Sequence, residues 1–245
     1  MTQLYYDLHI HSALSPCGEN DMTPAAVAGM LALSGIGIAA LTDHNTCKNC
    51  PAFFEACNAY GVIPVAGMEL TVAEEIHVVC LFPTLEGALA FDGAVEERRM
   101  KINNREDIFG MQLIMNSDDE VIGKDPWFLP AATDIPLWEA PALAAQYGGI
   151  CYPAHIDRTS GGILAILGDF PPEMPFTCYE ISDYSKKGEY EEKYPVLKGK
   201  FCISSTDAHR MERLLDKNLS LPLGEGDADT VRQRLFALLK NEVTE

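Results

Sequence analysis

All six histidines of this 245-residue sequence lie within or directly after short apolar runs, and several of these runs also carry a carboxylate. Imidazole nitrogens and carboxylate oxygens together suit Zn, Mn or Fe ions, and the sequence has no obvious cysteine quartet of the structural zinc type. The residue types therefore predict a metal centre. Its candidate ligands are His9, His11, His44, Glu69, His77, His155, Asp207 and His209.

The spacing of these residues indicates that several of their side chains lie on the same face of a strand. His9 and His11 are two residues apart in a predicted strand, and Asp7 has the same parity, so the three side chains point to one face. Asp207 and His209 repeat this spacing at the end of another apolar run. One such histidine alone would be interpreted as a hydrogen-bonded core or rim residue. Six of six in such positions favour a common site.

The elements that must position these residues alternate between strands and helices, which is typical of a parallel sheet covered by helices. Seven strands are predicted at 4–10, 36–42, 63–70, 76–82, 149–154, 177–181 and 200–205. Helices are predicted at 24–33, 52–60, 85–101, 137–147, 163–168 and 229–241. In a (β/α) barrel the carboxyl ends of parallel strands open onto one rim, so residues from distant positions would converge there.

One stretch, from about 104 to 136, breaks the alternation. An apolar run at 108–115, a polar turn at 116–120 and a short run at 121–122 predict a hairpin. An irregular segment follows, with Pro126, Trp127, Phe128 and Pro130. We interpret this stretch as a small inserted cap over one end of a single domain spanning 1–245, and we expect it to help choose the substrate.

Two or three such ions close together have a defined chemistry. They lower the pKa of a bound water and clamp a phosphoryl group through its oxygens, so that metal-activated hydroxide attacks in line without a covalent nucleophile. A serine hydrolase is excluded on motif, because the sequence has no Gly-x-Ser-x-Gly.

The charge composition indicates which classes of binding partner are unfavourable. With 18 Lys and Arg against 36 Asp and Glu, the formal net charge is −18, which repels long nucleic acid and anionic lipid. No signal peptide and no membrane-spanning run is evident, so we expect a soluble, cytoplasmic protein with its eight cysteines reduced. Cys47 and Cys50 form a lone C-x-x-C, for which packing or a metal or redox role near the mouth both remain open.

The ordered motifs resemble those of the PHP (polymerase and histidinol phosphatase) superfamily, and they span residues 7 to 209. The motifs are Asp7-Leu8-His9-Ile10-His11-Ser12, Thr42-Asp43-His44-Asn45, Gly67-Met68-Glu69, His77, Pro153-Ala154-His155 and Thr206-Asp207-Ala208-His209. The resemblance implies a distorted seven-stranded, TIM-like (β/α) barrel with a trinuclear metal site and phosphoester hydrolysis.

The resemblance also implies how the ligands are shared. One ion would be held by His9, His11, Glu69 and Asp207, and a second by Glu69, His77 and His155, with Glu69 as the bridge. His44 and His209 would serve a third ion with an acidic or histidine ligand five residues after His11. That position is Pro16 here, a departure from the family pattern. Glu19 lies near the slot, and Cys17 or Asp21 could also reach it.

Other charged residues receive supporting roles. Asp7 and Asp43 are interpreted as groups that orient ligand imidazoles, a role that metal-bound histidines nearly always need filled. Arg158 and Arg210 closely follow two of the predicted ligands and would offer bidentate donors to a substrate phosphate. The alternative for each arginine is an ordinary solvated surface residue.

The sequence thus predicts a metal-dependent phosphoesterase acting on a small phosphorylated metabolite or nucleotide, with two or three divalent ions as cofactors. Three alternatives stay open: a non-catalytic, metal-stabilised regulatory or polymerase-associated module, an exonuclease on short oligonucleotide ends, and a redox protein that uses Cys47 and Cys50. The sequence does not predict the substrate, the metals or the oligomeric state.

Overall fold

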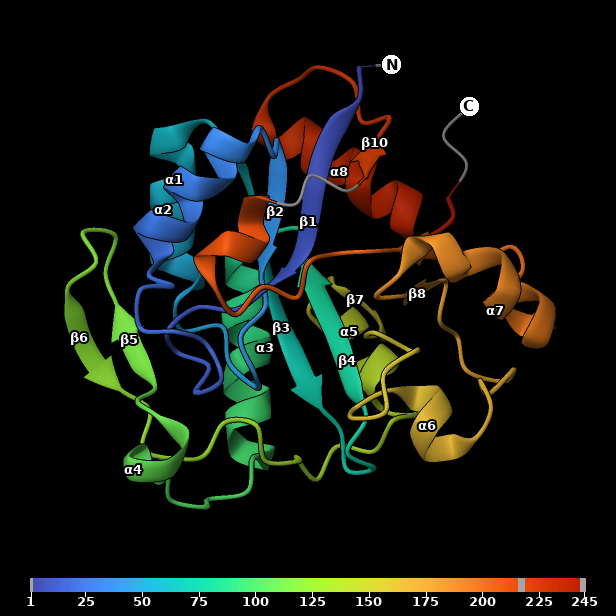
Figure 1. The fold of residues 1–245 in the computed structure, drawn as a ribbon, viewed down its shortest axis with the longest axis horizontal. Coiled ribbons are helices and arrows are strands. Elements are labelled where there is room, and N and C mark those ends of the chain that lie inside the picture. The colour runs from blue at the N-terminus through green and yellow to red at the C-terminus, as the bar shows by residue number, and fades with distance from the viewer. Residues whose placement is uncertain (1, 216–218, 243–245) are drawn as a thin grey trace.

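Six strands form the central sheet, in the order β10–β1–β2–β3–β4–β7 (Figure 1). The computed structural model describes residues 2–215 and 219–242. β1, β2 and β3 are parallel, whereas β4 is antiparallel to both β3 and β7, and β10 is antiparallel to β1. The bounds are β1 Leu4–Ile10, β2 Ile38–Leu41, β3 Ile63–Thr71, β4 His77–Phe82, β7 Ile150–Pro153 and β10 Ser220–Leu221.

A separate parallel pair consists of β8 (Cys178–Glu180) and β9 (Phe201–Ile203). Each of the seven predicted strands therefore has a counterpart, but the seven-stranded barrel is not confirmed. Within the described residues no strand ladder joins β7 to β8 or β9 to β1. The strand ends are tied at one rim, where the Ile156 N–H donates to the Glu180 carbonyl (2.9 Å) and the His11 N–H donates to the Ala208 carbonyl (3.0 Å). The result is a mixed α/β fold with a curled sheet.

The helices begin and end largely where the sequence signals them. α1 (Pro24–Ser34) has Thr23 as its N-cap and ends at Gly35, whose φ of 71° is the left-handed conformation that glycine adopts easily. None of the helices in 2–215 and 219–242 combines the length and apolarity needed to cross a bilayer. The other helices that follow predicted segments are α2 Cys50–Tyr60, α3 Leu85–Arg98, α5 Ala140–Gln146, α6 Ile163–Leu167 and α8 Ala228–Leu239. Those not predicted are α7 Lys187–Lys193 and the 3₁₀ turns Tyr184–Lys186, Pro195–Leu197 and Met211–Leu215.

Two apolar cores lie on opposite faces of the strands. In β2, Ile38 and Ala40 belong to the core that also contains Leu235 of α8, whereas Ala39 and Leu41 belong to the core that contains Phe53 of α2. This alternation follows from the two-residue period of a strand. Because both faces of the strands are covered by apolar contacts, the polar side chains are concentrated at the strand ends.

The hairpin of the inserted stretch is formed by β5 (Leu113–Met115) and β6 (Val121–Lys124) around the predicted polar turn. Residues 106–109, of which the last two were predicted to begin the first strand of the hairpin, form the short helix α4 (Glu106–Phe109) instead, ending at Gly110. The hairpin packs on Ala13, in the loop after β1, and lies at the left edge of Figure 1 beside α1 and α2.

A buried asparagine joins the hairpin to the loop after β1. The Asn49 amide donates to the Ser12 hydroxyl (2.9 Å) and the Leu113 carbonyl (3.0 Å), and its oxygen accepts the Met115 N–H (2.9 Å). Asn49 is fully buried, so in the folded protein these groups bond to the side chain and not to solvent.

We expect Asn49→Ala to lower the free energy of unfolding by about 2–4 kcal/mol, because it leaves buried backbone groups unpaired. Urea denaturation measures the loss. Asn58→Ala, on the exposed side of α2, is the matched control and should change stability by less than about 0.5 kcal/mol. Equal effects of the two substitutions would show that this connection does not stabilise the fold.

Candidate metal centre

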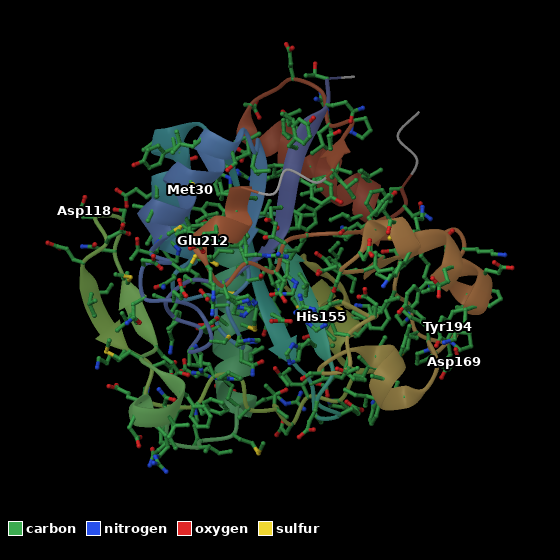
Figure 2. All side chains as sticks on the ribbon, viewed as in Figure 1. Met30, Asp118, His155, Asp169, Tyr194 and Glu212 are labelled. Carbon is green, nitrogen blue, oxygen red and sulfur yellow. The ribbon has the colours of Figure 1, made fainter. Side chains whose placement is uncertain are left out.

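The predicted ligands come from distant parts of the chain and meet in one buried cluster. Because β4 is antiparallel, its first residue reaches the same rim as the last residues of the parallel strands. Figure 2 shows His155 near the middle of the molecule, whereas Asp118 and Asp169 lie at its periphery. The ligands lie as follows: His9 in β1, His11 after β1, His44 after β2, Glu69 near the end of β3, His77 at the start of β4, His155 after β7, and Asp207 and His209 after β9.

The Glu69 carboxylate lies at the centre of the cluster and is 1% exposed. The shortest approach is 2.8 Å from Oε1 to His77 Nδ1, and the longest is 3.4 Å from Oε2 to His9 Nε2. One carboxylate with both oxygens surrounded by imidazoles is what a bridging ligand requires. Its oxygens lie within this range of five histidines: His9, His11, His44, His77 and His155.

The second carboxylate, Asp207, faces the same nitrogens. Its Oδ1 is 3.1 Å from His11 Nε2 and 3.3 Å from His9 Nε2, yet this buried oxygen forms no hydrogen bond. The two Nε2 atoms are themselves 3.3 Å apart. Lone pairs that face one another in a buried site are costly unless cations or protons lie between them. This donor set therefore fits divalent metal ions.

The candidate ligand atoms fall into three overlapping groups, within each of which all atoms lie within 4.8 Å of one another. The first group has the composition predicted for the first ion. In the second, His44 joins the predicted Glu69 and His77, while His155 Nε2 is 3.0 Å from Glu69 Oε1. The third holds three imidazoles and no acid. The groups are His9, His11, Glu69 and Asp207; His44, Glu69 and His77; and His11, His44 and His209.

Two predicted residues lie outside the cluster. Glu19 Oε1 and Arg210 Nε are 3.2 Å apart, and their side chains are 45% and 68% exposed. The assignment of Glu19 as a metal ligand is therefore wrong, and Arg210 is engaged in a surface ion pair. Their positions along the chain suggested proximity, but the loop directs the two opposite charges at each other.

Arg158 lies at the rim, beside Asp207. Its Nη1 contacts Asp207 Oδ2, and its Nε donates to the Ser182 hydroxyl at 3.2 Å. The side chain is 43% exposed, so part of the guanidinium faces solvent at the edge of the cluster.

Asp43 acts on the imidazoles through a serine. Its carboxylate accepts the Ser12 N–H and hydroxyl (2.7 and 2.6 Å) and the Ser15 hydroxyl (2.7 Å). Ser15 Oγ is 2.9 Å from His11 Nδ1. Because the Ser15 proton is given to Asp43, Oγ accepts from Nδ1–H, and His11 Nε2 is left as the ligand atom.

The expected role of Asp7 is also corrected, because among the described residues its hydrogen-bond partners are a hydroxyl and backbone N–H groups and not an imidazole ring. Asp7 accepts the Thr206 hydroxyl (2.5 Å) and the backbone N–H groups of Thr206 (3.2 Å) and His9 (3.3 Å). Burial raises the Asp7 pKa to about 6, although hydrogen bonds from Thr206 oppose the shift. Asp7 therefore ties β1 to the segment that carries Asp207.

The residue that orients His9 is Glu180, which the sequence reasoning missed. Glu180 ends β8, is 1% exposed, and places both carboxylate oxygens 3.0–3.1 Å from His9 Nδ1. It holds a proton on Nδ1 and leaves Nε2 facing Asp207 and Glu69. The signal was present, because Glu180, like Glu69, is an acid near the end of an apolar run.

Three residues at the rim adopt left-handed backbone conformations. The φ angles are 51° for Asn45, 26° for His155 and 48° for Asp207. Such conformations cost about 1–3 kcal/mol each and persist where the surroundings fix them. Asn45, for example, donates from its amide to the carbonyls of Leu129 (2.7 Å) and Ala131 (2.9 Å), which fastens the segment after the hairpin to the metal rim.

The Cys47–Cys50 pair packs below the rim. Both thiols are buried, and both donate to the Gly67 carbonyl, with Sγ–O distances of 3.2 and 3.6 Å. Gly67 is required by close packing, because a Cβ there would lie 2.8 Å from Thr42 Cγ2. The candidate ligand groups found in the described ranges contain no cysteine. These contacts favour the packing interpretation.

The electrostatics of the cluster predict proton release on metal binding. Burial opposes charge on His11, but the neighbouring Asp207 and Glu69 carboxylates outweigh it and raise the His11 pKa to about 9, whereas burial lowers the His209 pKa to about 4. At pH 7 the metal-free protein therefore holds a proton on His11 that an ion must displace. Calorimetric titration with Zn or Mn in two buffers of different ionisation enthalpy should give different heats, and the difference should become smaller above about pH 9, where His11 has lost its proton. Buffer-independent heats at pH 7 would contradict this.

Glu180→Gln should weaken metal binding by about 10–100-fold, because the amide no longer holds the proton on His9 Nδ1 as a carboxylate does. Competition with a chromophoric chelator measures the affinity. Glu189→Gln, an exposed change on α7, is the matched control. An unchanged affinity in Glu180→Gln would remove Glu180 from the metal site.

Comparison with solved structures places the fold among known proteins. The chain is 18% identical to a protein from Bifidobacterium adolescentis proposed to be a metal-dependent phosphoesterase, with 95% and 96% of the two chains covered and a TM-score of 0.53. It is 14% identical to PsfC from Pseudomonas syringae, with 96% and 88% covered and a TM-score of 0.56.

A third neighbour is the lesion-specific endonuclease EndoQ from Pyrococcus furiosus, at 18% identity and a TM-score of 0.54. The alignment covers 85% of this chain but 49% of the endonuclease, so this chain matches about half the length of that protein. No curated protein sequence matches the chain. Residues 7–122, which include His9, His11, His44, Glu69 and His77, match the family model of the PHP domain.

Proposed function

We propose that this protein is a metal-dependent phosphoesterase that hydrolyses the monoester of a small phosphorylated metabolite or nucleotide. The observation that carries the proposal is the convergence of five imidazoles on the buried Glu69 carboxylate, with Asp207 facing the same nitrogens. Divalent cations held there would neutralise phosphate charge and lower the pKa of a water molecule. In the reaction, water adds to phosphorus, the ester P–O bond breaks, and the alcohol and inorganic phosphate leave.

The cluster has a buried side and an open side. His9 and His11 are fully buried, whereas the side chains of His77 and His209 are 22% and 27% exposed. The buried histidines hold the site in shape, and the exposed ones border the side from which a phosphate would enter. Arg158 stands at this open edge, where its free guanidinium N–H groups would bind a phosphate oxygen.

A nuclease is the second candidate, because the Pyrococcus endonuclease shares the fold. Against it stands the net charge of −18, which opposes approach of a long polyanion. Short oligonucleotide ends carry less charge, so hydrolysis of such ends is measured alongside the small phosphate esters. The same measurement distinguishes the non-catalytic alternative.

Phosphate release with Mn or Zn from 4-nitrophenyl phosphate, phosphorylated metabolites and short oligonucleotides tests the proposal. Asp207→Asn should lower kcat/KM by about 100-fold or more, since loss of even a supporting contact to a metal ligand costs 10–100-fold. Asp118→Asn, at the exposed hairpin tip, should leave it unchanged. A folded, metal-containing protein with no turnover would support the non-catalytic module, and a strong preference for oligonucleotides would support the nuclease.

A further inference from the structure

A cavity of about 460 Å³ adjoins the metal cluster at His77. Its lining comes from the segment 128–132, from the loop 159–161, and from Thr71, Glu75 and His77. His77 places Nδ1 2.8 Å from Glu69 Oε1, so one face of this ring belongs to the cluster while the side chain remains 22% exposed. A phosphate ester bound at the cluster therefore has this cavity beside it.

The cavity wall at His77 is shaped by a glycine. The Gly161 carbonyl accepts the His77 N–H at 2.9 Å, and a Cβ on Gly161 would lie 2.8 Å from the His77 ring. Asn45 fixes the segment 128–132, which also lines the cavity, through the Leu129 and Ala131 carbonyls. Both walls are thus fastened to residues at the metal rim, which makes the cavity part of the site.

The lining of the cavity consists mainly of apolar and hydroxyl-bearing side chains, and its one acidic side chain is Glu75. Phe128, Pro130 and Ile166 provide apolar surface, and Thr71 and Thr159 provide hydroxyl groups. No Lys or Arg is among the described residues that line it. Glu75 supplies a carboxylate whose side chain forms no hydrogen bond or ion pair within the described part of the chain.

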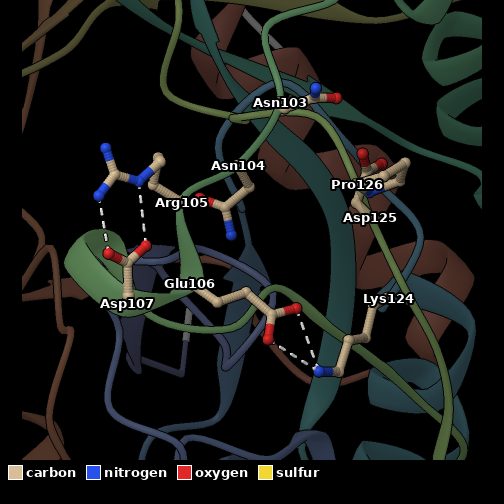
Figure 3. A pocket seen from close by; sticks show the side chains of 8 residues that line it. All are labelled: Asn103, Asn104, Arg105, Glu106, Asp107, Lys124, Asp125 and Pro126. Carbon is tan, nitrogen blue, oxygen red and sulfur yellow. Dashed lines mark hydrogen bonds and ion pairs between the residues drawn. The ribbon is translucent and has the colours of Figure 1, made fainter.

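A second cavity, of about 520 Å³, differs from the first because its charged side chains are paired (Figure 3). There Arg105 pairs with Asp107 and Lys124 pairs with Glu106. Asp125 pairs with Lys48 and Arg99, which are outside the lining, so each charged side chain of this cavity has a partner. The lining of that cavity comes from residues 103–107 and 124–126 and does not include His77. The unpaired carboxylate of the first cavity is therefore a feature of the surface beside the metal cluster.

Building on the proposed phosphoesterase function, we infer that this cavity receives the alcohol part of the substrate and that Glu75 is a specificity-determining residue that selects against a second phosphate. A second anionic group would meet the Glu75 carboxylate with no cationic side chain in the lining to offset it. An apolar or cationic alcohol part meets apolar surface, hydroxyl groups and one negative charge. The preferred substrates are monoesters whose organic part is uncharged or positively charged.

Three substrates with the same four-carbon chain test the inference: butyl phosphate, 4-aminobutyl phosphate and butane-1,4-diol bisphosphate. The wild-type kcat/KM, counted per phosphate, should be lowest for the bisphosphate. Glu75→Gln should lower the preference for the aminated ester over the bisphosphate by about two- to fivefold, the range of an exposed ion pair. Glu75→Lys should reverse the preference.

Glu74→Gln is the matched control, because Glu74 lies outside the cavity lining and accepts the Leu137 N–H at 2.9 Å. It should leave the substrate ratios unchanged. If butyl phosphate is hydrolysed but Glu75→Gln and Glu75→Lys leave the ratios as in the wild type, the inference is overturned while the proposed function stands. If no metal-loaded form hydrolyses any of the three esters, the proposed function fails and the inference with it.

Discussion

The burial of the Glu69 carboxylate among five imidazoles is the constraint on which the rest of the structure depends. Burial alone would raise the Glu69 pKa, but the surrounding histidines, His77 foremost, hold it well below its usual range. The pKa values of these histidines shift in opposite directions. Burial lowers the pKa of His44, whereas Glu180 and Asp207 raise the pKa of His9 despite its burial. Protons alone cannot satisfy all these atoms at once, whereas divalent cations can.

The surrounding structure fixes which nitrogen of each ring faces the centre. Glu180 holds the proton on His9 Nδ1, and Ser15, itself held by Asp43, does so for His11. The Asp207 carbonyl accepts from His209 Nδ1 at 2.9 Å. These partners come from β8, from the loops after β1 and β2, and from the segment after β9. The curled sheet is therefore needed less for its closure than for bringing these strand ends to one rim.

Much of the site could be predicted from the sequence, because ligand residues carry their own chemical signal and strands carry a two-residue period. The pairing of strands was not predictable in the same way. Reasoning from parallel strands leaves His77 at the wrong end of its strand, and the antiparallel direction of β4 resolves this. Glu19 and Arg210 were placed by distance along the chain, and the loop conformation that pairs them carries no local signal. Glu180 was missed although its position resembles that of Glu69.

In the inserted stretch, too, the local structure could be predicted from the sequence but its tertiary position could not. Its polar turn and flanking apolar runs predicted a hairpin, which β5 and β6 confirm. Where the hairpin docks depends on tertiary contacts, namely Asn49 and the Asp119 carboxylate that accepts the Thr23 hydroxyl at 2.6 Å. The segment that instead borders the metal rim is the irregular one after it, held by Asn45, and no periodicity marks such a segment.

The most direct test of the central claim is thermal unfolding of the purified protein before and after complete metal removal, with elemental analysis of the same samples. Ions that bind only the folded state at 1,000 times their Kd add about 4 kcal/mol, which for a chain of this size corresponds to roughly 10 °C in Tm. We predict bound divalent ions, a Tm that falls by about this amount on stripping, and a much smaller fall in Glu69→Gln. A metal-free wild-type preparation whose Tm is unchanged by added Zn, Mn or Fe would contradict the account.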